Sequence, residues 1–496
     1  MDRPHILLIM TDQHRADHVG WHPHSRLALP NIDRIAEGHA FLNCITANPI
    51  CTPARTGLLT GRYTHQIGTL AMSGDLPRGI PTYAQALRRA GYHTAGIGKF
   101  HWLQTAKWGA PMGHGVDLAG LHDELQGYGF DEVWEATGKQ LALANRCDWC
   151  RRLEAKGLLD AYRRHVRAEG GNSMTAEKTV FRGDPWPFAE EDYADIVTAD
   201  RMLESLRRRP ADKPFFGFLS FCSPHAPFDP PERFLRQVPP EQDDAFVLGG
   251  PDDEPMSEAA RERMRKLRRA YKAMLLCVDE QVGWIFAALE AEGMWDNTVI
   301  LFTSDHGEML GDHGHFQKMR FQSQSTVVPT AIRHPAHLNG GRCDRVIELT
   351  DLTATILDAA GLEPAAALSK DWPAFNDRIP ARSLLPILRG ETDAVRPYAF
   401  CECNGAWYMI QDETRKYVYR PGADEGTADR EHLFAWRDDP AEAHDLAPDE
   451  ASRPVLERMR ARLLHILATT PAAQTRWAPL MGADGSDDFP LAGKVT

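Results

Sequence analysis

The chain has 496 residues, of which 43% are hydrophobic and 25% charged, and its net charge is −13. This composition is that of a globular protein with room for one large core and a smaller second domain. The acidic balance argues against a nucleic-acid or anionic-membrane surface, because both need clustered Lys and Arg. An anionic ligand would need a local cationic pocket.

No segment predicts export or membrane insertion. The apolar run Ile6–Met10 is too short for a signal-peptide core, and no apolar stretch approaches the roughly 20 residues that span a bilayer. The nine cysteines do not form the framework of a small disulfide-rich protein. Cys147 and Cys150 are spaced like half of a metal site, but no second pair follows, so we expect a structural role. We therefore expect a cytoplasmic protein with reduced thiols.

Apolar strands alternate with helices along the first 300 residues. Strands are expected at residues 6–10, 94–98, 215–221 and 298–303. Helices are expected at residues 31–37, 82–90 and 257–292, the last with a break near its start. This alternation predicts an α/β fold with a large, mostly parallel sheet flanked by helices. Polar residues follow the strand ends, where such sheets bind ligands.

The character of the sequence changes after about residue 360. Two β-rich runs, 407–411 and 416–419, precede a helical pattern at 454–469. They predict a smaller C-terminal antiparallel-sheet subdomain with a terminal helix. We place the main domain at 1–375 and the C-terminal α+β subdomain with its tail at 376–496.

One short motif is more specific than any other part of the chain. Residues 51–61 read CTPARTGLLTG, which matches the signature Cys-x-Pro-x-Arg-x4-Thr-Gly. Here the chain resembles the type I sulfatases of the alkaline-phosphatase superfamily. The resemblance implies an alkaline-phosphatase-like fold, a catalytic domain at 1–375, and conversion of Cys51 to formylglycine by a maturation enzyme. Taken alone, Cys51 could instead be a small buried hydrophobe in a turn.

Two residue pairs at strand ends resemble the metal ligands of that family. The resemblance implies that Asp12, Gln13, Asp305 and His306, together with the converted Cys51, hold one divalent metal ion. Hard oxygen donors suit Ca²⁺, Mg²⁺ or Mn²⁺, and the imidazole nitrogen favours Mn²⁺. Taken singly, Asp12 could cap a helix and His306 could be a hydrogen-bonded core histidine.

Further polar residues resemble the family's catalytic groups. These are Arg55, Lys99, His101, His225 and Lys318. The resemblance implies that the hydrated formylglycine attacks sulfur and that the two lysines offset charge on the sulfuryl oxygens. It also implies that Arg55 holds the diol, that His225 protonates the leaving oxygen, and that His101 acts as the base that releases sulfate.

Two other regions carry polar or aromatic clusters. Asp312, His313 and His315 could form a second metal site, but a solvated loop beside the pocket is the more common outcome. Residues 132–187 contain several tryptophans, which could form a substrate-selecting lid or fill a subdomain core, the more common fate.

These inferences predict hydrolysis of a small-molecule sulfate ester to an alcohol or phenol and inorganic sulfate. A phosphonate monoester hydrolase or phosphodiesterase of the same superfamily is the alternative, because phosphoryl and sulfuryl groups differ mainly in charge. The Lys99-x-His101 pattern favours the sulfatase branch. A non-enzymatic binding module would lack a metal ligand, and all the expected positions are filled. Aryl, alkyl and sugar sulfates are not distinguished, and the tail 475–496 could be disordered or could dock on a neighbouring subunit of a homo-oligomer.

Overall fold

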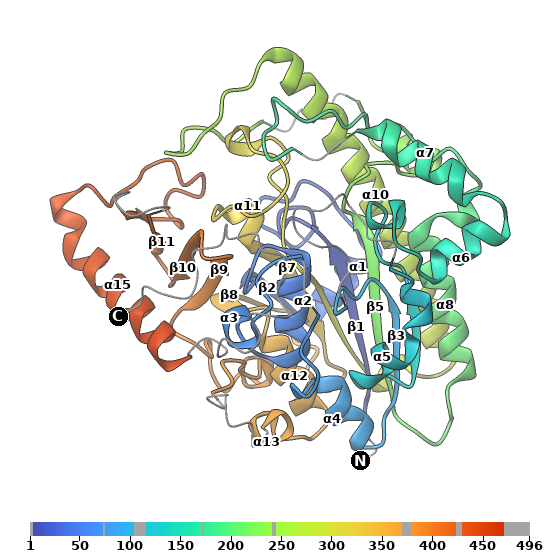
Figure 1. Ribbon diagram of the computed structural model, residues 1–496. Coiled ribbons are helices and arrows are strands. Elements are labelled where there is room, and N and C mark those ends of the chain that lie inside the picture. The colour runs from blue at the N-terminus through green and yellow to red at the C-terminus, as the bar shows by residue number, and fades with distance from the viewer. Residues whose placement is uncertain are drawn as a thin grey trace.

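The computed structural model describes residues 3–72, 75–103, 116–170, 173–240, 245–369, 378–422 and 429–470. Within these residues the chain forms an eight-stranded sheet and a separate four-stranded sheet (Figure 1). The strands of the first sheet are β1 His5–Asp12, β2 His39–Ile45, β3 His93–Gly98, β4 Glu132–Glu135, β5 Phe215–Pro224, β6 Thr298–Ser304, β7 Val327–Arg333 and β8 Gly341–Glu348. Their order is β4-β3-β5-β1-β6-β7-β2-β8. Only β7 runs antiparallel to its neighbours among these described strands, so the predicted mostly parallel sheet is confirmed.

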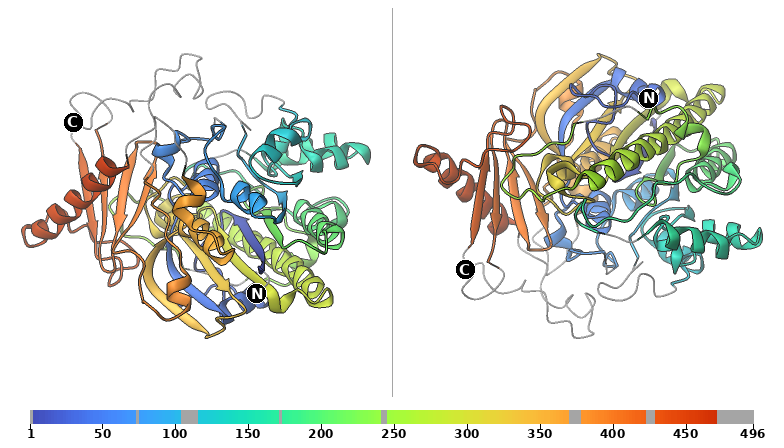
Figure 2. Two further views of the ribbon diagram at one scale, coloured as in Figure 1. Left: turned by 90° about the horizontal axis from the view of Figure 1, so that it is seen from below. Right: turned by 90° about the horizontal axis from the view of Figure 1, so that it is seen from above.

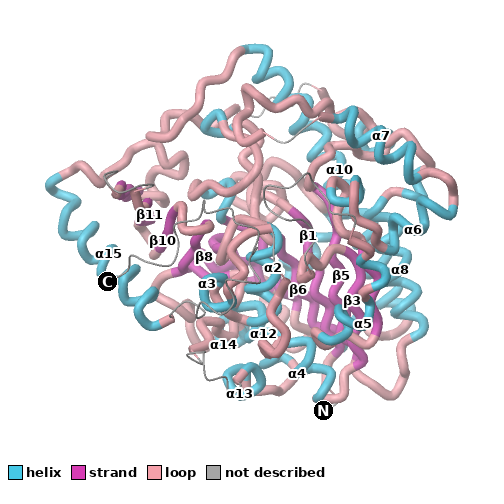
Figure 3. The backbone as a smooth tube through the Cα atoms, viewed as in Figure 1, coloured by secondary structure: helices cyan, strands magenta, loops and turns pink. Residues whose placement is uncertain are grey.

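Helices cover both faces of this sheet (Figures 2 and 3). Those of the main body are α1 Pro30–Asp33, α2 Cys51–Thr60, α3 Thr64–Ile67, α4 Tyr83–Arg89, α5 His122–Gly127, α6 Asp148–Ala155, α7 Leu159–Glu169, α8 Ala194–Arg208, α9 Glu232–Leu235, α10 Glu258–Ala291, α11 Ser323–Thr326, α12 Asp351–Ala359, α13 Pro364–Leu368 and α14 Leu385–Leu388. The helix α10 runs without the expected break. No helix of the described residues combines the length and apolarity needed to cross a bilayer.

Strand β1 shows how the two faces are filled. Ile6, Leu8 and Met10 pack into the core shared with α2, α4 and α12, whereas Leu7 and Ile9 pack into the core shared with α8 and α10. Successive side chains of a strand point to opposite faces, so a strand covered on both sides needs apolar residues throughout. This is why the run at residues 6–10 has no polar member.

The second sheet lies beside the β8 and β2 edge of the first. Its antiparallel strands are β9 Ala399–Cys403, β10 Trp407–Gln411, β11 Lys416–Arg420 and β12 Arg430–Phe434. Helix α15 Arg453–Thr469 packs on it through Leu456, Met459 and Leu463. The predicted C-terminal sheet and helix are therefore confirmed. The expected boundary at 375/376 and the tail 475–496 fall outside the described residues.

Candidate active site

Four neighbouring parallel strands deliver polar residues to one edge of the large sheet. Strand β1 ends at Asp12, β6 ends just before Asp305, β3 ends just before Lys99, and β5 ends just before His225. These strands are adjacent in the order β3-β5-β1-β6. Because parallel strands finish at the same edge, residues up to 293 positions apart in sequence meet there.

Cys51 lies at the first position of α2, and the rest of the motif explains that helix. Pro53 stands in the first turn, where the backbone N–H has no partner within the helix in any case. Arg55, one turn later, lies on the same face as Cys51. Gly61 ends the helix with a φ of 68°, which glycine adopts readily. The motif therefore places residue 51 at the positive end of a helix dipole.

Four side chains form one buried group that could hold a metal ion. The ligand atoms of Asp12, Cys51, Asp305 and His306 all lie within 4.8 Å of one another. Cys51 Sγ, at the place where the expected formylglycine would carry its oxygens, is 3.6 Å from Asp12 Oδ1 and 3.2 Å from His306 Nε2. All four residues are buried. Two carboxylates, an imidazole and residue 51 therefore converge, as the sequence predicted.

The histidine of this group has the tautomer that a metal ligand needs. His306 Nδ1 lies 2.9 Å from the Gly307 carbonyl oxygen, so Nδ1 carries the hydrogen and the Nε2 lone pair faces Cys51. Burial lowers the pKa of His306 to about 4, against the raising effect of Asp305. A neutral imidazole with a free Nε2 suits a divalent cation.

Gln13 lies beside this group, and its amide bridges two other side chains. Its Oε1 accepts a hydrogen bond from Lys318 Nζ at 3.0 Å, and its Nε2 donates to Glu308. Its backbone N–H donates to Asp305 Oδ1 at 2.9 Å. Gln13 therefore positions Asp305 and Lys318, and its predicted role as a metal ligand stays a prediction.

Arg55 is held by partners on or just after three strands, β6, β3 and β5. Its Nε donates to Asp305 Oδ2 at 2.8 Å, and Nη1 donates to the Lys99 carbonyl oxygen at 2.6 Å and to Ser220 Oγ at 2.7 Å. Ser220 was missed in the sequence, although it interrupts the apolar run at residues 215–221 of strand β5. That interruption is the signal that could have identified it.

Both predicted lysines lie beside Cys51, and Lys318 also contacts His225. Lys99 Nζ is 3.8 Å from Cys51 Sγ and forms an ion pair with Asp12. Lys318 Nζ is 2.9 Å from Cys51 Sγ and 3.0 Å from His225 Nε2. His225 is only partly buried whereas Cys51 is fully buried, so His225 marks the outer side of the site.

His101 has one ring nitrogen committed and one available. Its Nε2 lies 2.7 Å from the Thr137 carbonyl oxygen, so Nε2 carries the hydrogen. Its buried Nδ1 has no hydrogen-bond partner within the part of the chain that the structure describes. Burial, reinforced by Lys99 and Arg55, lowers the pKa of His101 well below its ordinary value. A neutral imidazole with a free nitrogen is suited to accept a proton.

The charges of the site favour an anion. Three cationic side chains, Arg55, Lys99 and Lys318, stand with two carboxylates, Asp12 and Asp305. Burial raises the pKa of Asp12, but Lys99, Arg55 and Lys318 together lower it by more than burial raises it. The net pKa is below its ordinary value, so the carboxyl group stays ionised. The side chains alone therefore carry one excess positive charge, and a divalent cation would add two more.

Comparison with known proteins gives the family. The sequence model of the family described as "Sulfatase" matches residues 4–362. The chain belongs to the sulfatase family. The predicted sulfatase and alkaline-phosphatase-superfamily membership is thereby confirmed, and the protein is a hydrolase of this family.

Named relatives and solved structures agree with this assignment. The chain is 30% identical to a choline-sulfatase of Rhizobium meliloti over 490 residues, covering 92% of this chain and 86% of the relative. It is 29% identical to an arylsulfatase of Clostridium perfringens over 381 residues, covering 72% and 75%. The structure of a phosphonate monoester hydrolase of Agrobacterium radiobacter is similar with a TM-score of 0.72 and 26% identity, covering 94% and 96%. The expected alkaline-phosphatase-like fold is confirmed.

The histidine-rich stretch of this sulfatase is not a solvated loop, so that expectation was wrong. His313 and His315 are buried. His313 Nδ1 lies 2.7 Å from Asp253 Oδ1, and His315 Nε2 lies 2.8 Å from the Asp252 carbonyl oxygen. Partners about 60 residues away in the sequence therefore bind one ring nitrogen of each imidazole, and the sequence near them gave no sign of it. The other nitrogens, His313 Nε2 and His315 Nδ1, have no hydrogen-bond partner among the described residues.

The tryptophans of residues 132–187 fill a core, as their more common fate predicts. Trp149 and Trp186 are buried and pack against Tyr162. Cys147 and Cys150 are buried beside them with free thiols 3.4 Å apart. A structural role for this segment fits these contacts.

Glu135, at the end of β4, predicts a measurable pH dependence of stability. Burial raises its pKa from 4.5 to about 8, although the Phe100 amide lowers it. Because the folded-state pKa is the higher one, folding binds a proton, and stability falls as the pH rises from about 4.5 to about 8. We expect Glu135→Gln to remove this slope. The loss of wild-type stability between low pH and pH 8 that the variant avoids is on the order of 4 kcal/mol.

The measurement is urea unfolding of wild type and Glu135→Gln at pH 5, 6, 7 and 8. Glu154→Gln, which removes an exposed carboxylate, is the control and should follow wild type. Parallel curves for wild type and Glu135→Gln would show that the carboxyl titrates normally.

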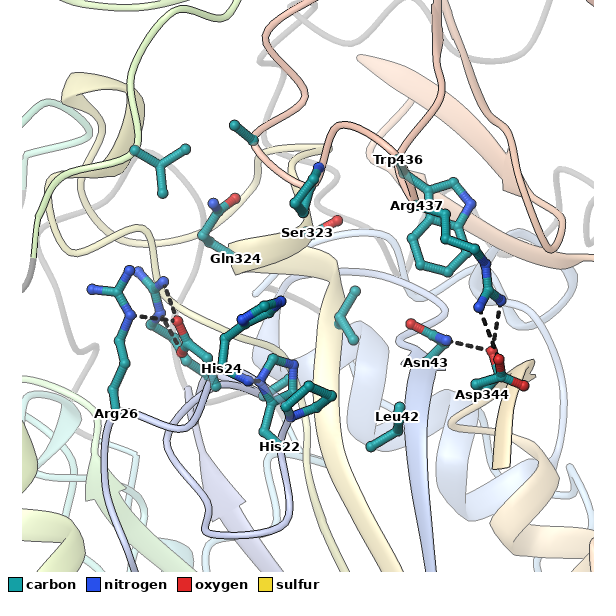
Figure 4. A pocket seen from close by; sticks show the side chains of 18 residues that line it. His22, His24, Arg26, Leu42, Asn43, Ser323, Gln324, Asp344, Trp436 and Arg437 are labelled. Carbon is teal, nitrogen blue, oxygen red and sulfur yellow. Dashed lines mark hydrogen bonds and ion pairs between the residues drawn. The ribbon is translucent and has the colours of Figure 1, made fainter. Parts of the chain in front are cut away.

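A cavity lies between the main body and the C-terminal subdomain, apart from the predicted active-site residues (Figure 4). It has a volume of about 500 Å³, and its lining includes His22, Leu42 and Trp436 but none of the predicted site residues. The charges on its walls already have partners, because Arg26 pairs with Asp17 and Arg437 pairs with Asp344. This cavity therefore lacks the free cations that an anionic substrate needs.

Proposed function

We propose that this sulfatase hydrolyses small-molecule sulfate monoesters, with Cys51 converted to formylglycine by a maturation enzyme and one divalent metal ion beside it. The observation that carries the proposal is the convergence of Asp12, Asp305 and His306 on residue 51 at the start of α2. The excess of buried cations around the same residue supports an anionic substrate. We also propose that the protein is cytoplasmic. This location favours a small substrate over a polymer.

The donor set fits a divalent cation. Asp12, Asp305, His306 and the converted residue 51 would hold it, and Mn²⁺ or Ca²⁺ suits these ligands better than a softer metal. When bound, the ion would lower the pKa of the formylglycine hydrate and offset negative charge on the substrate.

Side chains of the protein bind the sulfuryl group, orient the diol and transfer the protons. Lys99 and Lys318, both beside residue 51, bind the sulfuryl oxygens as compact positive charges. Arg55, fixed by Asp305 and Ser220, orients the diol. As the S–O bond breaks, its electron pair passes to the leaving oxygen, which takes the proton shared by Lys318 and His225. In the release step His101 Nδ1 accepts the proton of the second hydroxyl, the C–O bond to sulfate breaks with its electron pair leaving on sulfate, and the aldehyde C=O of residue 51 forms again.

Phosphonate monoester hydrolysis is the second candidate, and the structural similarity to the Agrobacterium radiobacter enzyme favours it. The two reactions share a nucleophile and a metal site but differ in the charge of the transferred group. We rank sulfate first because the Lys99-x-His101 pattern resembles that of the sulfatases, and Lys99 Nζ lies 3.8 Å from Cys51 Sγ.

Matched esters of one phenol decide between these candidates. We expect metal-loaded enzyme to show a higher kcat/KM for the aryl sulfate than for the aryl phosphonate. A phosphonate preference above about tenfold, roughly 1.4 kcal/mol, would reverse the ranking. Relatives are named for aryl, choline and N-acetylglucosamine-6-O-sulfate substrates, so a panel of these three esters narrows the alcohol.

A further inference from the structure

Three consecutive residues after β4 each contact a different part of the candidate active site. The carbonyl oxygen of Thr137 accepts the hydrogen bond from His101 Nε2 at 2.7 Å. Gly138 packs on Lys99, because a Cβ on this glycine would lie 3.4 Å from Lys99 Nζ. Lys139 Nζ donates to the carbonyl oxygen of Pro227 at 2.7 Å, two residues beyond His225.

Lys139 is a buried charge that no step of the proposed reaction uses. Its ammonium forms an ion pair with Asp229 at 2.6 Å and a hydrogen bond to Tyr193 Oη at 3.1 Å. Both charged side chains are fully buried. A buried ion pair is seldom more stabilising than apolar side chains of similar volume, because desolvation offsets the attraction. The stability of the fold alone therefore does not explain this ion pair. A need to hold the neighbouring backbone in one conformation does explain it.

The segment that Lys139 holds is the loop carrying His225. Before His225, the backbone N–H groups of Cys222 and Ser223 bind Asp195 Oδ1 at 2.7 and 3.3 Å. After His225, Lys139 binds the Pro227 carbonyl oxygen and Asp229. The loop is thus anchored on both sides of His225.

Tyr193 joins these two anchors. Its hydroxyl lies 3.1 Å from Lys139 Nζ and 3.3 Å from Ser223 Oγ. The side chain of His225 is oriented within the loop by its Nδ1, which lies 2.9 Å from the Ala226 carbonyl oxygen. Nε2 of His225 consequently faces Lys318. A shift of the loop would move Nε2 away from the leaving oxygen without touching the metal group.

We propose that Lys139, paired with Asp229, is a positioning residue that holds the His225 loop so that the leaving oxygen receives its proton. The proposal rests on the proposed function, in which His225 and Lys318 supply that proton as the S–O bond breaks. Lys139 does not contact the reacting atoms; it acts through the backbone of residues 223–229.

Leaving-group dependence tests this role, because esters of weakly acidic alcohols need the proton and esters of acidic phenols do not. The variant Lys139→Met/Asp229→Asn removes both charges and leaves no buried ion unpaired. We expect kcat to fall about 10- to 100-fold for alkyl sulfates but less than about threefold for 4-nitrophenyl sulfate. KM should change little, since the lysines that bind the sulfuryl group are untouched.

A double-mutant cycle with His225→Ala separates positioning from general damage. If Lys139 acts through His225, adding Lys139→Met/Asp229→Asn to His225→Ala causes no further loss with alkyl sulfates. A further loss by the same factor, or an equal loss on all esters in the wild-type background, would overturn the proposal. Lys416→Met/Glu442→Gln is the matched control, because it removes another fully buried ion pair, from β11. Its leaving-group dependence should equal that of wild type.

Two further experiments test the role of Lys139 if the first variant does not fold or if the enzyme does not cleave sulfate esters. If Lys139→Met/Asp229→Asn does not fold, Tyr193→Phe removes only the hydroxyl that joins the two anchors and should give a smaller effect in the same direction; an equal effect on every ester would count against the proposal. If wild type cleaves no sulfate ester but cleaves phosphonates, the proposed function is wrong. The same leaving-group series made as phosphonates then tests Lys139 independently.

Discussion

Replacing Cys51 by alanine is expected to reduce kcat for sulfate esters by about 10⁴-fold or more, the size of loss that follows removal of a nucleophile. The physical reason is that residue 51 supplies the attacking group, and none of the surrounding side chains replaces it. Burial, with Asp12 adding to it, raises the pKa of the Cys51 thiol above its ordinary value. An unconverted cysteine would therefore remain a neutral thiol near pH 7.

The same experiment reports on the modification. Peptide mass spectrometry of active wild type should show residue 51 about 18 Da lighter than cysteine. Activity should scale with the converted fraction across preparations made with and without a maturation enzyme. Cys343→Ala, which removes a buried thiol of β8, is the control and should keep full activity. Full activity in a preparation containing only the thiol would refute the formylglycine mechanism.

Loss of the metal group is expected to have the next largest effect. We expect Asp12→Asn to lower kcat/KM by about 10³-fold at micromolar metal, because it removes one of the two carboxylates that would hold the ion. Three cationic side chains, Arg55, Lys99 and Lys318, already lie beside these ligands. Chelator treatment of wild type should abolish activity. Mn²⁺ or Ca²⁺ should restore it in wild type and restore it only at much higher concentration in Asp12→Asn.

Calorimetric titration of the chelated proteins checks the cause. Wild type should bind one equivalent of metal, and Asp12→Asn should bind it more weakly. Asp279→Asn is a matched control, since Asp279 is a buried carboxylate that binds the backbone N–H groups of Asn31 and Ile32 and does not belong to the group of possible metal ligands. It should leave both metal affinity and activity unchanged. Chelated wild type with full activity would exclude a role for the ion.

Local patterns were sufficient wherever neighbouring residues decide the structure. The apolar run at residues 6–10 predicted a buried strand, and the structure confirms it. The helix that starts at Cys51 was not predicted, although Pro53 and Gly61 of the motif fit its first turn and its end. Spacing and residue type also identified the candidate metal ligands and catalytic residues, which lie at one edge of the sheet in the structure. Their individual roles stay predictions.

Contacts between distant segments could not be predicted in this way. Arg55 binds Asp305, 250 residues away, and Ser220 on another strand. Lys139 looks like any surface lysine in the sequence, and only the fold shows it buried against Asp229.

The sequence by itself thus determined the family motif, the strand and helix pattern, and the residue types that meet at the sheet edge. Tertiary structure alone decided that His313 and His315 are buried, that Gln13 binds Lys318, and that residues 137–139 support the site. The reason is physical: periodicity and capping depend on near neighbours along the chain, whereas the burial of a polar side chain depends on which distant partner the topology brings to it.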